Sequence, residues 1–193
     1  MNLSIIIPVY NGAMYLPETF LELGELVKNH QIIFVNDGST DETGALLEKF
    51  HKEHTPTVTV IEYLENKGKG YAIREGLQKI AKECTEVAFT DVEIPYGIQA
   101  LQSGFHLLEE NDDLSFVYGT RTAAAKTESQ YSLYRKIGTR LFRLLLPREL
   151  RNVSDTQSGL KVFKKKAAEI IFSRVKTNRW VFDTEIFLIA QEH

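Results

Sequence analysis

Short apolar runs alternate with segments of helical spacing along most of the chain, and this alternation restricts the fold more than any other feature. The apolar runs at 3–10 and 31–36 are continuous, which is typical of strands buried on both faces of a parallel sheet. Further strands are expected at 57–63, 86–91 and 114–121, and helices at 15–29, 37–54, 70–84 and 96–111. Repeated strand–helix units predict an α/β fold with a mainly parallel sheet and helices on both faces.

Length and composition favour one domain. The 193 residues are 43% hydrophobic, which is enough for a full core. The formal net charge of -3 argues against binding of nucleic acid through bulk electrostatics. Cys84 is the single cysteine, which excludes a disulfide framework and fits a reducing, cytoplasmic compartment. The first residues lack a signal-peptide pattern, and no apolar run reaches the roughly 18–20 residues of a membrane span.

Glycines, polar residues and charged residues follow each predicted strand. Because the carboxyl ends of parallel strands lie on one edge of a sheet, where α/β folds bind ligands, we expect these residues to form one site. The clusters are Pro8–Gly12, Asn36–Asp41, Asn66–Gly70, Thr90–Glu93 and Gly119–Arg121. Any one of them is also explained as a turn, since pairs such as Asp37-Gly38 are common in turns. Their coincidence on one edge favours a ligand site.

Two acidic residues at this edge have a chemical interpretation. Asp91 and Glu93 supply hard oxygen ligands for a divalent cation that would bridge a diphosphate. The alternative is that both are solvated acids in a loop. Asp37 offers an acceptor for the imino N–H of a uracil or the amide edge of another base, or else it is an ordinary turn residue.

A glycine-rich and basic loop precedes the third predicted helix. Lys67 and Lys69 supply positive charge, while Gly68 and Gly70 would allow the backbone to approach a nucleotide or sugar closely. The alternative is a solvated loop before a helix. Ile73 occupies the third glycine position of the dinucleotide fingerprint, and acids follow the fourth predicted strand, so a nicotinamide-binding oxidoreductase is disfavoured. No P-loop sequence is present.

Several motifs, in order, resemble the family 2 glycosyltransferases, whose fold is the GT-A nucleotide-sugar-binding domain. The motifs are "SIIIPVYNGAMYL", "FVNDGSTDET" and "ENKGKGYAIREGL", and the resemblance covers essentially the whole chain. "FTDVEIP" stands where the family carries its Asp-x-Asp metal motif, and "YGTR" where it usually has Gly-Ser-Arg. "SDTQSGLKVFKKKAAEIIF" and "NRWVFDTEIFLIA" look most like the branch that makes polyprenyl-phosphate sugars, the dolichyl-phosphate β-glucosyltransferase type in particular.

The resemblance implies a metal-dependent, inverting transfer of a sugar from a nucleotide diphosphate, with UDP-glucose as the expected donor. It places a nucleotide-binding part at about 1–120 and an acceptor-side part at about 121–193 of a single domain. Asp91 and Glu93 would hold Mg²⁺ or Mn²⁺. The residues expected to bind the base, ribose and phosphates are Pro8, Tyr10, Asn11, Asp37, Gly38, Ser39, Lys67, Lys69 and Gly70.

The acceptor side is expected to combine arginines with the segment that follows residue 153. A phosphate acceptor needs positive contacts, and Arg121 and Arg135 suit bidentate phosphate binding. Asp155 is expected near the anomeric carbon as a base or an ordering group, with Thr156 and Gln157 lining the sugar pocket. The catalytic set is therefore Asp91, Asp155 and Arg121. The alternative for Asp155 is a helix cap or a turn.

Two departures from the family pattern leave other functions open. Glu93 replaces the usual second Asp of the metal motif, which permits a catalytically silent nucleotide-sugar-binding module. The predicted helix at 181–193 stops at His193, whereas family members continue, so we expect further segments that complete the acceptor site or a membrane anchor. Transfer to a sugar hydroxyl in surface polysaccharide synthesis is the other alternative.

The segment 134–151 is basic and amphipathic. Its basic residues are interleaved with isoleucine, leucines and phenylalanine, as in helices that lie on anionic lipid. It would place the protein on the inner face of a membrane, near a lipid-linked phosphate. The alternative is a helix that packs on the domain or on a second copy in a homodimer.

Overall fold

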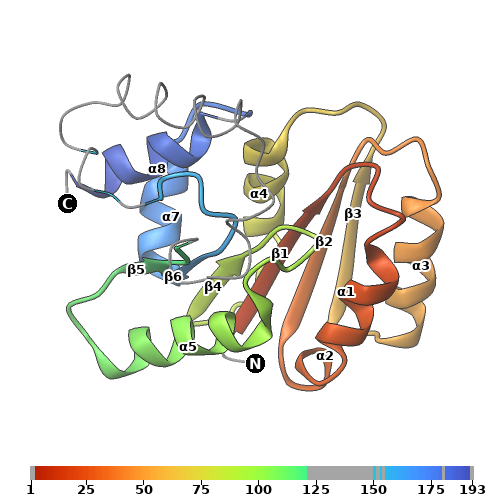
Figure 1. The fold of residues 1–193 in the computed structure, drawn as a ribbon, viewed down its shortest axis with the longest axis horizontal. Helices are drawn as coiled ribbons and strands as arrows, with labels where there is room; N and C mark the ends of the chain where they lie inside the picture. The colour runs from red at the N-terminus through yellow and green to blue at the C-terminus, as the bar shows by residue number, and fades with distance from the viewer. Residues whose placement is uncertain (1–2, 121–149, 151–152, 154, 180, 192–193) are drawn as a thin grey trace, which may run out of the picture.

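The computed structural model describes residues 3–120, 150, 153, 155–179 and 181–191, which form an α/β fold with a sheet between two layers of helices (Figure 1). The six-stranded sheet has the order β3-β2-β1-β4-β6-β5. Its strands are β1 (Leu3–Val9), β2 (Gln31–Asp37), β3 (Val58–Tyr63), β4 (Glu86–Phe89), β5 (Phe116–Tyr118) and β6 (Lys161–Lys164). The helices are α1 (Leu16–Leu23), α2 (Leu26–Asn29), α3 (Thr43–Glu53), α4 (Lys69–Leu77), α5 (Gly97–Glu110), α7 (Lys165–Arg174) and α8 (Phe182–Ala190).

The direction of the strands decides which segments meet. β1 pairs in parallel with both β2 and β4, and β2 pairs in parallel with β3, as the apolar runs predict. β6 is antiparallel to β4 and β5 and lies between them. Because its direction is reversed, β6 begins at the edge where the parallel strands end. The residues that precede β6 therefore join the predicted binding edge.

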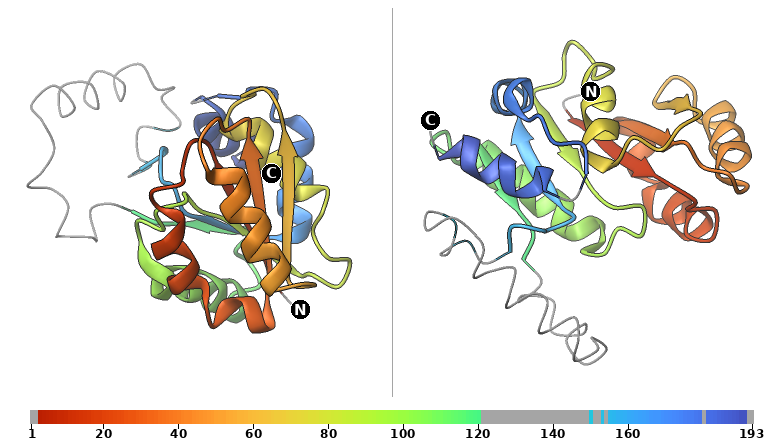
Figure 2. Two further views of the ribbon diagram at one scale, coloured as in Figure 1. Left: turned by 90° about the vertical axis from the view of Figure 1, so that its right-hand side faces the viewer. Right: turned by 90° about the horizontal axis from the view of Figure 1, so that it is seen from above.

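Alternate residues of the central strand feed two separate cores. Ile5 and Ile7 of β1 pack in a cluster with apolar residues of α1, α3 and α5. Ile6 packs in a second cluster with residues of α4, α7 and α8. The helices therefore cover both faces of the sheet (Figure 2), and both faces of its central strands are apolar. This is why β1 and β2 read as continuous apolar runs.

The helix predicted within 37–54 begins differently from its pattern. Ser39 and Glu42 have the spacing of a capping box, which predicts Ser39 as the cap residue of this helix. This prediction is wrong, because the cap residue of α3 is Glu42 and it makes no side-chain cap bond. The Ser39 hydroxyl instead accepts the backbone N–H of Asn11 at 2.9 Å. Asp41 Oδ1 accepts the N–H of Thr43 at 3.0 Å. The hydroxyl joins two loops instead of closing the helix.

Two other helices are shorter than predicted. The helix expected at 15–29 is divided into α1 and α2, and Gly24 follows the end of α1. The helix expected at 70–84 ends at Leu77, because the buried side-chain amide of Gln31 replaces helical bonds beyond it. That amide donates to the carbonyl of Lys79 at 3.0 Å and accepts the N–H of Ala81 at 2.8 Å.

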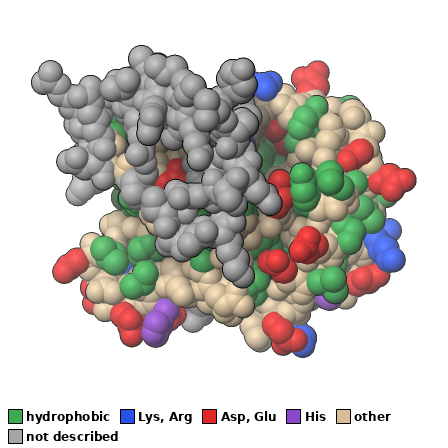
Figure 3. All heavy atoms as spheres, in the orientation of Figure 1, with side chains coloured by type: hydrophobic (Ala, Val, Ile, Leu, Met, Phe, Trp, Pro, Cys, Tyr) green, Lys and Arg blue, Asp and Glu red, His purple; other side chains and the backbone are tan. Residues whose placement is uncertain are grey.

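The surface agrees with the negative formal charge. Figure 3 shows Asp and Glu side chains spread over the described part of one face, with Lys and Arg side chains at its margins. Within the described residues, no helix is both long enough and apolar enough to cross a membrane. The basic segment 134–151 lies outside the described residues, except for Leu150, which is buried.

Candidate functional site at the carboxyl edge of the sheet

The site lies where the strand order reverses. The chain passes from β1 outward to β2 and β3 and then returns through α4 to β4, on the other side of β1. Ligands of open α/β sheets bind in the crevice beyond the carboxyl ends of the strands at such a point. Asp91 is the second residue after the end of β4, and Lys69 is the first residue of α4. Both residues therefore face this crevice.

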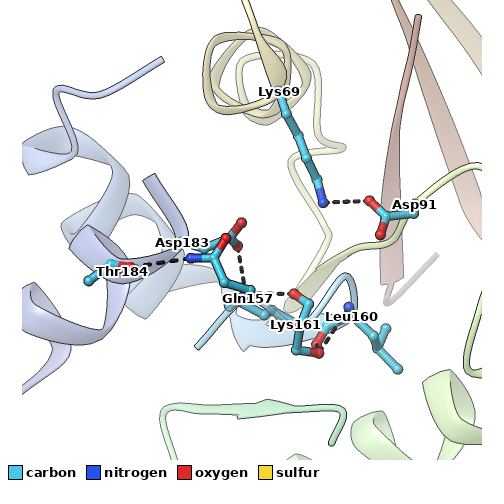
Figure 4. Close-up of polar contacts among 8 residues, drawn as sticks. Lys69, Asp91, Gln157, Leu160, Lys161, Asp183 and Thr184 are labelled. Carbon is cyan, nitrogen blue, oxygen red and sulfur yellow. Dashed lines mark hydrogen bonds and ion pairs between the residues drawn. The ribbon is translucent and has the colours of Figure 1, made fainter. Parts of the chain in front are cut away.

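Lys69 and Asp91 form an ion pair across the crevice. The Lys69 Nζ lies 2.5 Å from Asp91 Oδ1, and the two side chains are 28% and 37% exposed (Figure 4). Burial on its own would lower the pKa of Lys69, but the carboxylates of Asp91 and Asp183 outweigh it and hold that pKa above its usual value. Lys69 therefore stays charged and faces a ligand as a cation.

A second, buried ion pair lies beside the first. The Lys161 Nζ is 2.6 Å from Asp183 Oδ1, and these side chains are 0% and 7% exposed. Burial lowers the pKa of Lys161 and raises the pKa of Asp183, in spite of their mutual attraction. The sequence reading did not select either residue. The available signal was a lysine inside the apolar run "GLKVF" and an aspartate in the largely apolar run "VFDTEIFLIA", which also carries Glu185.

The segment before β6 connects the two pairs. A Cβ at Gly159 would lie 2.0 Å from Asp91 Oδ2, so only glycine fits against this carboxylate. The side-chain amide of Gln157 donates to the Thr184 hydroxyl at 3.2 Å (Figure 4). Thr156 is buried, and Asp155 is half-buried and interacts electrostatically with Lys161. The segment that carries Asp155, Thr156 and Gln157 thus reaches the Asp91 carboxylate at Gly159.

Asp37 holds the loop that precedes α4. Its carboxylate accepts the N–H of Lys67 at 2.8 Å, the N–H of Gly68 at 2.9 Å and the amide of Asn66 at 3.0 Å. The residue is 3% exposed. These bonds link the end of β2 to the start of α4 and thereby help to position Lys69.

The loops after β1 and β2 are tied to each other. Asn11 donates its N–H to Ser39 Oγ at 2.9 Å and accepts the N–H of Thr40 at 2.8 Å. Gly38 has a φ of 71°, a conformation that favours glycine. Tyr10 is 53% exposed, and Pro8 is half-buried. With these hydrogen bonds in place, the Tyr10 ring remains exposed at the carboxyl edge of the sheet.

Lys67 and Gly70, which were expected to face a nucleotide, contact other residues of this chain. The Lys67 Nζ lies over the Tyr71 ring, 4.7 Å from its centroid, and is not paired with Asp91. The N–H of Gly70 donates to the carbonyl of Asn178 at 2.8 Å. A Cβ at Gly70 would meet Phe182 at 2.9 Å. Close packing against Thr177, Asn178 and Phe182 of the same chain therefore accounts for Gly70.

The described residues supply part of a metal site. Glu93 is exposed, Asp91 is partly exposed, and no group of three or more Asp, Glu, His or Cys side chains able to hold a metal occurs among the described residues. Mg²⁺ and Mn²⁺ bound with phosphates commonly use only one or two protein carboxylates. The donor set fits a cation that shares its ligands with a diphosphate. Arg121 and Arg135 lie outside the described residues.

Comparisons with known proteins identify a family and relatives for this chain. Residues 4–172 match the family described as glycosyl transferase family 2. A dolichyl-phosphate beta-glucosyltransferase of Dictyostelium discoideum is 30% identical over 206 residues, covering 98% of this chain and 62% of the relative. The Homo sapiens enzyme of that name is 30% identical over 204 residues, covering 98% and 63%. The chain thus spans less than two thirds of the length of either relative.

Two solved structures share the fold. The glucosyl-3-phosphoglycerate synthase of Mycobacterium tuberculosis in complex with UDP has a TM-score of 0.66 at 16% identity, covering 88% of this chain and 59% of that one. A mannosyltransferase of Pyrobaculum calidifontis in complex with GDP-Man and Mn²⁺ has a TM-score of 0.63 at 18% identity, covering 96% and 51%. Both similarities support the GT-A fold.

Proposed function

The chain belongs to glycosyl transferase family 2, and from this premise we propose that it transfers glucose from UDP-glucose to the phosphate of a polyprenyl phosphate, with inversion. The acceptor is proposed because relatives 30% identical to this chain are named dolichyl-phosphate beta-glucosyltransferases. The structural observation that carries the proposal is the Lys69–Asp91 pair, with its 2.5 Å contact at the topological switch point. In the reaction, an acceptor phosphate oxygen bonds to the anomeric carbon as the bond to the diphosphate breaks and UDP leaves.

The donor side uses the loops after β1, β2 and β3. Tyr10 offers an exposed ring for the base, and Pro8, Asn11, Gly38 and Ser39 form the loops beside it. Asp37 supports the α4 loop, and we assign it to base recognition together with Tyr10. Lys69 brings a charged ammonium to the diphosphate, which develops negative charge as the sugar departs.

A divalent cation, Mg²⁺ or Mn²⁺, is the proposed cofactor. Asp91 would hold it, with Glu93 as a second oxygen donor. Among the described residues, Lys69 is the one side chain that donates a hydrogen bond to the Asp91 carboxylate, so the carboxylate keeps lone pairs for a cation. When bound, the cation would neutralise the charge that develops on the leaving diphosphate.

The acceptor side lies around the start of β6. A phosphate acceptor is already anionic, so positive contacts matter more for it than a strong general base. We assign these contacts to Arg121 and Arg135. Asp155 orders the reacting groups from the segment that also carries Thr156 and Gln157.

A direct assay tests the proposal. The protein is incubated with radiolabelled UDP-glucose, Mn²⁺ and a polyprenyl phosphate, and label is measured in the organic phase, with GDP-mannose as the control donor. Label in the lipid fraction with UDP-glucose is the expected result. Asp155→Asn should lower turnover about 10²–10⁴-fold and leave donor affinity nearly unchanged.

Other outcomes assign other functions. Label transferred only to an oligosaccharide would replace the phosphate acceptor by a sugar hydroxyl. Nucleotide binding without UDP release, with every acceptor supplied, would indicate a silent binding module.

A further inference from the structure

We propose that Lys161 and Asp183 are positioning residues for the Asp91 carboxylate, because their buried ion pair fixes the segment 158–160 against it. The inference deepens the proposed function and rests on the donor-site role assigned to Asp91. Lys161 and Asp183 have no role in the donor and acceptor sites proposed above. Neither residue is proposed to touch the substrate.

Lys161 is anchored on two sides. Its Nζ donates to Asp183 Oδ1 at 2.6 Å and to the carbonyl of Ser158 at 2.7 Å. The second bond returns to the lysine's own preceding turn, so the ammonium closes the segment 158–161 into a compact loop. The first bond attaches this loop to the first turn of α8. Breaking the ion pair would therefore release the loop from α8.

Further bonds hold the same loop. The Ser158 hydroxyl donates to the carbonyl of Leu160 at 3.0 Å. That carbonyl also accepts the N–H of Gly119 at 3.0 Å, which links the loop to the end of β5. Gln157 is bonded to Thr184, the residue after Asp183, at 3.2 Å. The first turn of α8 thus holds the segment 157–161 at two points.

The loop reaches Asp91 through Gly159. A Cβ at Gly159 would lie 2.0 Å from Asp91 Oδ2 and 2.8 Å from its Cγ, so the glycine backbone lies directly against the carboxylate. A loop fixed by Lys161 consequently limits where that carboxylate can turn. Lys69 holds the other oxygen of the carboxylate, Oδ1 (Figure 4).

Stability alone does not explain an ion pair at this depth. Well-packed apolar residues often replace a buried ion pair without loss of stability. Asp183 has a further electrostatic effect, because its carboxylate also attracts Lys69. The charges alternate from Asp91 through Lys69 and Asp183 to Lys161. Lys69 therefore keeps a second carboxylate nearby when Asp91 engages a ligand.

The test uses a double substitution that removes both charges and keeps the volume similar. Lys161→Met and Asp183→Leu alone should each lower the melting temperature, since each leaves a buried charge without its partner. The double variant Lys161→Met/Asp183→Leu should recover most of that loss. Amide hydrogen exchange in 156–160 should nevertheless remain about 10-fold faster than in the unsubstituted protein, as measured by mass spectrometry.

A second measurement tests whether loss of the ion pair affects Asp91. The Mn²⁺ concentration that gives half of the UDP-dependent thermal shift should rise about 10–100-fold in the double variant, the usual loss for residues that orient metal ligands. Lys164→Met, at the other end of β6, is the matched control and should leave both readouts unchanged. The double variant should also turn over more slowly than the unsubstituted protein, and a high Mn²⁺ concentration should restore its turnover.

Different results overturn different claims. Unchanged exchange in 156–160 would overturn the positioning role. Faster exchange with an unchanged Mn²⁺ midpoint would show that the pair does not act on Asp91, which also overturns it. If the unsubstituted protein shows no thermal response to UDP, the proposed function fails; if its response to UDP does not depend on Mn²⁺, only the metal role fails. In either case, exchange in Val87–Glu93 decides whether the pair orders the Asp91 segment.

Discussion

The backbone of Gly159 lies so close to the carboxylate of Asp91 that a Cβ at position 159 would be 2.0 Å from Oδ2. Real Cβ atoms do not approach a neighbour this closely, so one of the two groups must move if a side chain is added. The contact exists because β6 is antiparallel to β4, which brings the start of β6 to the end of β4. Gly159 is thus specified by the donor-site carboxylate beside it.

Gly159→Ala should damage the site and reduce stability. The methyl group must displace Asp91 or the 158–160 loop, and overpacking of this kind costs about 1–3 kcal/mol. Chemical denaturation measures the stability, and the UDP-dependent thermal shift with Mn²⁺ measures the site. Gly24→Ala, next to α1 with φ -50°, is the control and should change stability by less than about 1 kcal/mol. Equal effects of both substitutions would contradict the prediction.

Asp91→Asn should abolish the difference between the UDP-glucose thermal shifts measured in Mn²⁺ and in EDTA. The amide keeps the shape of the side chain but loses the charge that a divalent cation and Lys69 require. Glu93→Gln should have a smaller effect, because Glu93 is exposed. If the unsubstituted protein gives the same shift in Mn²⁺ and in EDTA, the proposed metal role is wrong.

Asp37→Asn should loosen the loop before α4. An amide offers one acceptor oxygen to the N–H groups of Lys67 and Gly68, so one buried donor loses its partner at a cost of about 1–3 kcal/mol. Faster hydrogen exchange at these two amides and a lower denaturation midpoint are expected. The control Asp112→Asn neutralises an exposed acid and should change neither the exchange at these amides nor the denaturation midpoint. A denaturation midpoint equal to that of the unsubstituted protein would show that Asp37 does not stabilise this loop.

Glu185 should make stability depend on pH in the acid range. Burial raises its pKa, but hydrogen bonds from the Thr177 hydroxyl and from the N–H groups of Lys176 and Thr177 outweigh this and hold the pKa below its ordinary value of 4.5. The folded state therefore binds this proton less readily than the unfolded state. The stabilisation is full above the ordinary value and is lost as pH falls through the lower folded-state pKa.

The substitution Glu185→Gln isolates this contribution. At pH 7 it should lower the free energy of unfolding by about 1 kcal/mol, a modest value because the carboxylate is partly exposed. The difference between the two proteins should shrink as the pH is lowered below 4.5, as measured by urea denaturation at several pH values. A difference that is constant with pH would assign the effect to packing instead of charge.

The basic segment 134–151 should bind anionic vesicles. Each basic residue near such a surface contributes about 1 kcal/mol, so four engaged residues would give measurable binding at low salt. Sedimentation with phosphatidylserine vesicles should show binding that falls with salt and weakens in Arg140→Ala/Arg143→Ala. Neutral vesicles are the control. No binding at low salt would favour a helix that packs on the domain and would weaken the proposal of a lipid phosphate acceptor.

Much of the fold follows from local patterns. Continuous apolar runs such as 31–36 predict strands buried on both faces, and the two apolar clusters confirm that helices cover both faces. The meeting of Lys69 with Asp91 was also predictable in outline, since parallel strands bring their carboxyl ends to one edge. The point at which the helix predicted at 70–84 ends was not predictable from local pattern. The Gln31 amide that bonds the chain beyond Leu77 comes from a strand distant in the sequence.

The sequence by itself determined the α/β class, the family and the edge that carries the charged groups, because these depend on periodicity and on residue types at strand ends. Only the tertiary structure decided that β6 lies between β4 and β5, that Gly159 lies against Asp91, and that Lys161 is paired with Asp183. A strand's pattern specifies which faces are buried, but not its neighbour or its direction. Those depend on the packing of segments far apart in the chain, and the partners of buried charges follow from that packing.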